Sequence, residues 1–275
     1  MKNITFFFLL FPFIIFSQDD LLGELNEEIT EDRKIISVFK SLKVVNFETT
    51  KLANKKDFYL VISHRFGSVK NGIDDLFGLD QAVTQFKFIY GVNEWLNIGV
   101  ARSSNQKKYG AHVKYRLKYQ EKNGFPVSIV GYNLITANTS LKVDVYPNIN
   151  FEDRLSYTSQ LLISRKFNDN LSLLLAPSFI HENLATRSFV QENGSTDFYD
   201  EENNQFALGF GGRYKVSKRI SLNIDYGLHL NRNENSVYNN PLSIGADIET
   251  GGHVFQVHFT NAQAMFEEGF ITQAQ

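Results

Sequence analysis

One stretch of the sequence, residues 109–119, concentrates basic side chains at alternate positions. In an extended chain, alternate side chains point to one face, so this strand would carry a basic face opposite an apolar one. The basic positions are His112, Lys114, Arg116 and Lys118. We expect Arg213, Lys215, Asp225 and His229 to point the same way from neighbouring strands. Inside a β-barrel these residues would favour anionic solutes if the lumen is open, or form salt bridges if it is filled.

The six histidines test whether the sequence carries a barrel hydrolase. Such an enzyme sets a catalytic His and Ser two positions apart on one strand, so that both side chains share a face. The residues two positions after each histidine are Phe66, Lys114, Asn183, Asn231, Phe255 and Thr260. None of them is serine. We therefore assign no catalytic residue and expect that the protein is not an enzyme.

Metal-binding patterns are also weak. His229, His258 and Asp225 could meet inside a barrel, but their spacing matches no recognised metal site, and ordinary polar residues of a lumen explain them better. The acidic connection 182–204 could bind a divalent cation or a partner, although a solvated surface loop is the simpler interpretation. The sequence has no cysteine, which excludes thiolate metal sites, disulfides and a lipoprotein anchor. We assign no metal site and no cofactor.

Strands must position these side chains. Residues 206–216 and 220–230 each alternate apolar and polar residues over about ten positions, a pattern typical of an antiparallel hairpin. About ten residues is also what a tilted strand needs to cross a bilayer. Similar runs predict eleven strands, at 35–47, 57–66, 83–91, 95–102, 109–119, 125–136, 155–166, 170–181, 205–216, 219–230 and 253–260.

The connections between these strands favour a membrane barrel, because short turns alternate with long polar loops. The long connections are 67–82, 137–154, 182–204 and 231–252. Two points conflict with the simplest barrel. Eleven is an odd number, and with 35–47 as the first strand the short turns would face outward. Either 35–47 is not an ordinary first strand or the orientation is reversed, and a closing strand after Gln275 would restore twelve.

Alternation alone does not say which face meets lipid, since a soluble periplasmic sandwich would show it too. Strand length, turn asymmetry and an aromatic content of 14% favour the membrane. A net charge of −2 and the lack of a basic aromatic stripe argue against nucleic acid as a partner.

The N-terminus predicts export. Lys2 precedes an apolar run at 4–16, which is too short to span a bilayer comfortably as a helix, and polar residues follow Ser17. We therefore predict a cleaved signal peptide over 1–17. Residues 18–34 have helical apolar spacing and form an amphipathic leader, either a cap on the barrel or a contact for a partner. The barrel domain is expected over 35–275, in the outer membrane.

Several segments resemble a known family. They are SHRFG (63–67), LFGLDQA (76–82), YG (90–91), WL (95–96), GV (99–100), RSS (102–104), FPVS (125–128) and FQVHFTN (255–261). The block 64–104 is the specific part. These segments resemble an uncharacterised Bacteroidota outer-membrane β-barrel family, a domain of unknown function numbered 5777. The resemblance implies the fold and the location, and it supplies no activity and no site residues. Family members usually continue into a final strand, in keeping with the expected closing strand.

We therefore expect an all-β, antiparallel, up-and-down transmembrane β-barrel of about twelve strands when complete. The favoured function is a narrow pore or small-solute channel. The alternative is a non-conducting barrel that has a structural or partner-binding role in the envelope. The expected partners are membrane lipid, small anionic solutes and a periplasmic or envelope protein.

Overall fold

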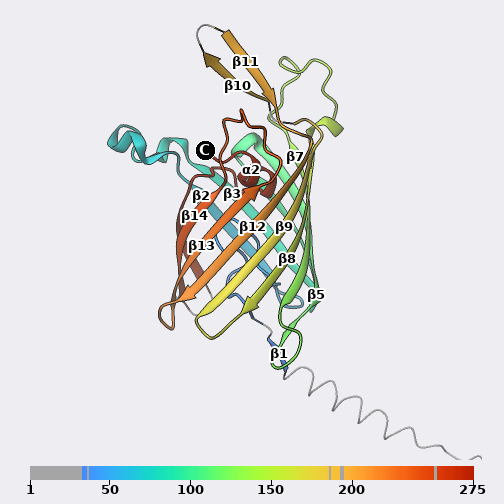
Figure 1. Ribbon diagram of the computed structural model, residues 1–275, viewed down its shortest axis with the longest axis vertical. Helices are drawn as coiled ribbons and strands as arrows, with labels where there is room; N and C mark the ends of the chain where they lie inside the picture. The colour runs from blue at the N-terminus through green and yellow to red at the C-terminus, as the bar shows by residue number, and fades with distance from the viewer. Residues whose placement is uncertain (1–32, 36, 186, 193–194, 251–252) are drawn as a thin grey trace, which may run out of the picture.

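The computed structural model describes residues 33–275, except 36, 186, 193–194 and 251–252 (Figure 1). The predicted signal peptide over 1–17 lies outside the described residues, as does the leader over 18–34 apart from its last two positions. Within the described part of the chain, no helix is long and apolar enough to cross a membrane.

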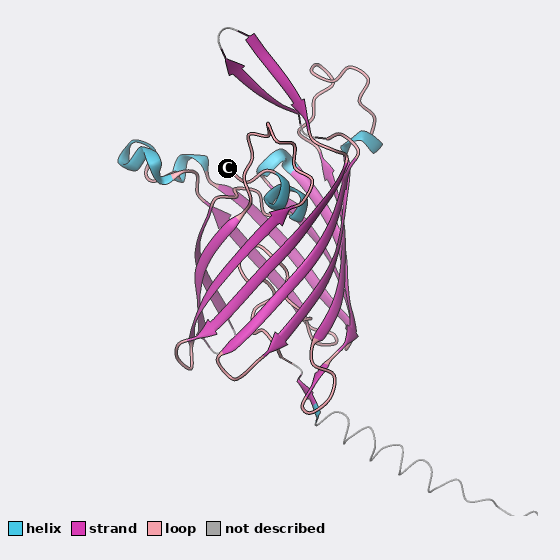
Figure 2. Ribbon diagram, in the orientation of Figure 1, coloured by secondary structure: helices cyan, strands magenta, loops and turns pink. Residues whose placement is uncertain are grey.

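Eleven strands form one antiparallel sheet that curls into a tilted cylinder (Figures 1 and 2). Each strand pairs with the next large strand along the chain, and β2 and β15 form the two edges of the sheet. The strands are β2 (Phe58–Arg65), β3 (Val83–Asn93), β4 (Leu96–Ser103), β5 (Lys108–Lys118), β7 (Ser128–Asn138), β8 (Leu155–Lys166), β9 (Leu171–Glu182), β12 (Asn204–Lys215), β13 (Ile220–His229), β14 (Leu242–Thr250) and β15 (His253–Thr260). The predicted all-β, antiparallel, up-and-down barrel fold is confirmed.

Smaller elements decorate both ends of this cylinder. The short strands β1 (Lys34–Ile35) and β6 (Gln120–Glu121) pair at one end, and β10 (Arg187–Glu192) and β11 (Ser195–Asp200) form a hairpin at the other (Figure 1). Helical elements in the described part of the chain include the 3₁₀ turns η1 (Val69–Asp75), η2 (Leu79–Gln81), η3 (Asn105–Lys107) and η4 (Glu152–Arg154), and the α-helix α2 (Glu267–Thr272).

Two strand predictions are wrong, and their errors cancel in the count of eleven. Residues 35–47 do not form a barrel strand, because their apolar side chains, such as Phe39 and Phe47, are buried inside the protein instead of facing outward. Residues 242–250, predicted to lie in a loop, form β14. The Asn-rich segment that precedes this strand, and the glycines within and after it, hid the alternation of Leu242, Ile244 and Ile248 with other residues.

With β2 as the first strand of the barrel, the short turns lie at the end where the chain enters the barrel, and the long connections lie at the other end. The long connections follow β2, β7, β9 and β13, whereas short turns follow β3, β8, β12 and β14. The pair β1–β6 lies at the short-turn end, so the chain enters the barrel there (Figure 1). This is the arrangement typical of membrane barrels with short periplasmic turns.

The sheet carries its apolar side chains on the outer face and its polar side chains on the inner face, the reverse of a soluble protein. On β13, Ile224 is 51% exposed, whereas the adjacent Asp225 is 1% exposed. The same contrast recurs on β3, where Phe88 faces outward and Lys87 is buried. A soluble sandwich would bury the apolar face, so this polarity argues against that alternative and places a lipid-facing surface outside a polar interior.

Candidate functional site

Two segments that are not part of the barrel wall fill its interior. We call residues 37–53 the N-terminal plug and residues 262–275, which include α2, the C-terminal plug. Side chains at the centre of both are fully or almost fully buried, among them Phe39, Val44, Phe47, Phe270 and Ile271. The rings of Phe47 and Phe270 meet edge to face at 5.0 Å between centroids. The two plugs therefore pack against each other as well as against the wall.

Glu48 of the N-terminal plug pairs with basic side chains of β3 and β5, the two strands that flank β4. Its carboxylate lies 2.6 Å from Lys87 Nζ on β3 and 2.8 Å from Lys114 Nζ on β5. All three side chains are at most 8% exposed. Buried charges are tolerated only when paired and hydrogen-bonded, so Glu48 compensates lysines that would otherwise face an empty lumen.

Asp225, which faces inward from the distant strand β13, anchors the same plug. Its Oδ2 accepts hydrogen bonds from the backbone N–H groups of Val45, Asn46 and Phe47, at 3.1, 2.6 and 3.2 Å. No described strand pairs with residues 45–47 of the plug. The Asp225 carboxylate therefore supplies the hydrogen-bond acceptor that a neighbouring strand would otherwise provide for these backbone N–H groups. At a third position on the wall, the Thr50 hydroxyl is in hydrogen-bond contact with that of Ser164 on β8.

The C-terminal plug is held by a second set of ion pairs. Glu268 accepts from Lys108 Nζ at 3.0 Å and from the Thr136 hydroxyl at 2.7 Å. Glu267 lies 3.5 Å from Lys43 Nζ of the N-terminal plug. The two plugs and the wall thus form one connected polar network.

Arg65, at the end of β2, joins both plugs directly. It donates from Nη1 to the carbonyl of Ala262 at 2.8 Å and to that of Ala264, and from Nη2 to the side-chain oxygen of Asn46. Its five N–H groups in a fixed fork suit such a bridge between segments.

Close approach of the plugs to the wall also depends on glycines of the inner face, and Gly209 is the clearest example. A Cβ atom at Gly209 would lie 2.3 Å from Cε1 of Phe47, which is far inside van der Waals contact. Glycine on the inner face of β12 therefore makes the space that the Phe47 ring occupies.

The predicted pore-lining residues are only partly brought together. His112, Lys114, Asp225, Arg213 and His229 are buried on the inner face. Lys215 is only half-buried.

Arg116 and Lys118 separate at a register shift in the pairing of β5 with β7. Arg116 donates to the Thr50 carbonyl of the plug at 2.7 Å. Lys118 is exposed and pairs with Glu121 at 3.5 Å. A bulge of this kind breaks the alternation on which the four-residue basic face was predicted.

Arg213 is paired too, 2.5 Å from Glu249 and 3.8 Å from Asp247, both on β14. The acids that neutralise the basic face were missed by sequence reasoning. Glu48, Glu267 and Glu268 lie outside the strands, and Glu48 is 66 positions from Lys114, so no local pattern connects them.

An antiparallel sheet with an apolar outside and a polar, filled inside defines the protein as a membrane β-barrel. The family model described as "Membrane bound beta barrel domain (DUF5777)" matches residues 39–275, so the chain belongs to this family, as its sequence segments predicted. No curated protein matches. A solved structure entitled "NanC porin structure in rhombohedral crystal form" is similar at 9% identity, over 70% of this chain and 87% of that one, with a TM-score of 0.45.

Proposed function

We propose that the protein is an outer-membrane barrel that does not conduct in the state described here, and that it serves the envelope as a structural or partner-binding element and not as an enzyme. The observation that carries this proposal is the network that ties both plugs to the wall. The N-terminal plug is bonded to β3, β5, β8 and β13, which lie around most of the cylinder. Such a cross-link holds the plug in place across the lumen.

The packing near the middle of the lumen supports the same conclusion. The space between Lys87, His112, Tyr132 and Glu267 has no room for a water molecule. Tyr132 is 1% exposed and fills this region from β7. Ion conduction needs a continuous hydrated path, and close packing of these side chains opposes one in this part of the lumen.

A gated small-solute channel is the second candidate. The wall behind the plugs stays polar, with Gln85, Asn97 and Ser103 on its inner face, so the lumen would accept water if the plugs moved. Displacement of Glu48 and Glu268 would also free Lys87, Lys108 and Lys114. The resulting channel would favour small anions, as the basic face on β5 predicted.

Single-channel recording in a planar bilayer separates the two candidates. We expect silence from the full chain, using only material that shows the heat-dependent gel mobility of a folded barrel. A variant in which residues 38–50 are replaced by a Gly-Ser segment of equal length should give discrete current steps, because it lacks Glu48 and the bulky plug side chains. Current steps from the unmodified chain would instead support the gated channel.

A further inference from the structure

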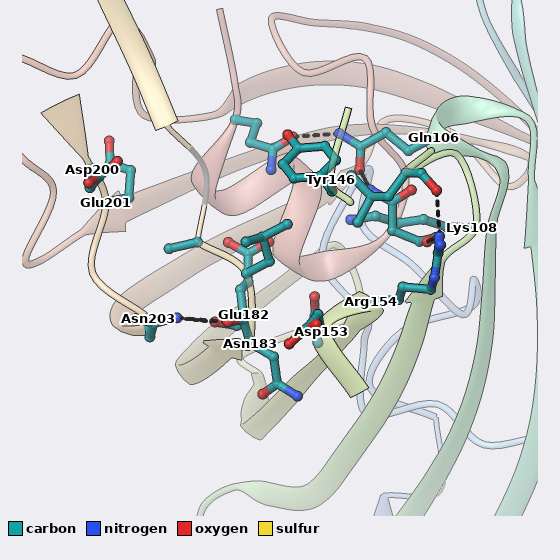
Figure 3. A pocket seen from close by; sticks show the side chains of 16 residues that line it. Gln106, Lys108, Tyr146, Asp153, Arg154, Glu182, Asn183, Asp200, Glu201 and Asn203 are labelled. Carbon is teal, nitrogen blue, oxygen red and sulfur yellow. Dashed lines mark hydrogen bonds between the residues drawn. The ribbon is translucent and has the colours of Figure 1, made fainter. Parts of the chain in front are cut away.

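A polar cleft of about 610 Å³ opens at the long-loop end of the barrel (Figure 3). It lies above the C-terminal plug, between the ends of β5, β7, β8 and β9 and the loops that extend from them. Its wall includes the amide side chains of Gln106, Asn138, Asn183, Asn203 and Gln273 and the ring of Tyr146. The volume is in the range typical of small-molecule sites, which span roughly 300–1,000 Å³.

Two buried carboxylates line this cleft, and in the described part of the chain neither forms an ion pair within 4.0 Å of a basic side chain. Glu182 is 4% exposed and Glu201 is 5% exposed. Glu182 accepts one side-chain hydrogen bond, from Gln205 Nε2 at 2.9 Å. Glu201 accepts from the backbone N–H of Asn233 at 3.1 Å through one oxygen, and its other oxygen, Oε1, has no partner.

The basic side chains that line the cleft, Lys108 and Arg154, contact other groups. Lys108 pairs with Glu268 at 3.0 Å. Arg154 donates from Nη1 to the carbonyls of Asn138 and Leu141, at 3.3 and 2.7 Å. Lys108 near Glu182 and Arg232 near Glu201 therefore act on these carboxylates only from beyond ion-pair distance, although a buried carboxylate is normally paired directly.

We propose that the cleft binds a small organic polyamine, whose ammonium groups pair with Glu182 and Glu201. An ammonium group presents three N–H donors, which suits both carboxylates and the neighbouring amide oxygens. A metal ion fits the donor set less well, because no group of three or more His, Asp or Glu side chains in the described residues could hold one. The proposal goes beyond the function proposed above and does not depend on whether the lumen conducts.

The test is isothermal titration of the folded full chain in detergent with spermidine at constant ionic strength. We expect saturable binding that the double variant Glu182→Gln/Glu201→Gln weakens about tenfold or more, since both ammonium groups lose a charged hydrogen-bond acceptor. Glu94→Gln is the matched control, because Glu94 is exposed in the short turn between β3 and β4, at the opposite end of the barrel.

Three results would overturn the proposal. The first is no saturable spermidine binding, and the second is equal binding by the double variant, which would indicate general surface charge. The third is tighter, carboxylate-dependent binding of calcium than of spermidine, which would make the cleft a metal site. Gel mobility before and after heating checks that each variant is folded, and the substitutions are isosteric, so loss of binding reports the loss of charge.

Discussion

Glu48→Gln should lower the free energy of unfolding by about 3–5 kcal/mol, because it leaves Lys87 and Lys114 buried without their counterion. The two ammonium groups lie 2.6 and 2.8 Å from the carboxylate and have little access to water. A neutral amide cannot compensate both charges. The folded fraction, read from heat-dependent gel mobility after equilibration in guanidinium, measures the change.

The companion variants make this prediction specific. Glu94→Gln removes an exposed acid and should change stability by less than about 0.5 kcal/mol. In the double variant Glu48→Gln/Lys87→Met the loss should be smaller than the sum of the single losses, because the first change removes the partner of the second. If Glu48→Gln behaves like Glu94→Gln, the ion pairs do not hold the plug.

Asp225→Ala should cost about 2–4 kcal/mol, since it leaves the backbone N–H groups of Val45, Asn46 and Phe47 without an acceptor. These groups lie in a buried segment that has no strand neighbour, so no other backbone carbonyl replaces the lost oxygen. The same equilibrium unfolding measurement applies.

Asp225→Asn provides the graded control for this carboxylate. It retains one neutral oxygen of the same shape and should lose roughly half as much stability as Asp225→Ala. Equal stability of all three proteins would mean that the plug turn is held by packing alone.

Most of the wall was predictable from the sequence because a barrel strand imposes a strict two-residue period. β13 alternates throughout and β12 does so except at Gly212, and each predicted end of these two strands differs from the observed end by one residue. Residues 35–47 also contain apolar residues in short runs, and burial inside a lumen satisfies such residues as well as lipid does. The spacing of apolar residues could not show whether residues 35–47 face lipid or lie inside the lumen.

The interior was predictable only in part for a related reason. Inward orientation of Lys114 follows from its place on β5, but the presence of Glu48 opposite it depends on tertiary structure. Glu48, Glu267 and Glu268 come from segments without a two-residue period, so the sequence does not indicate which way their side chains point. The bulge that separates Lys118 from Arg116 likewise depends on the pairing with β7.

The most direct test of the account is a disulfide between the N-terminal plug and the wall. The protein has no cysteine, so the pair Thr50→Cys/Ser164→Cys introduces two thiols into a clean background. The hydroxyls of Thr50 in the plug and Ser164 on the inner face of β8 are in contact. We therefore predict that the two thiols form a disulfide in the folded barrel. Mass spectrometry of unreduced peptides detects this bond. Thr50→Cys/Arg165→Cys, with the second thiol on the outer face of the same strand, should remain reduced. Free thiols in the first pair under the same oxidising conditions would contradict the placement of residues 37–53 inside the barrel.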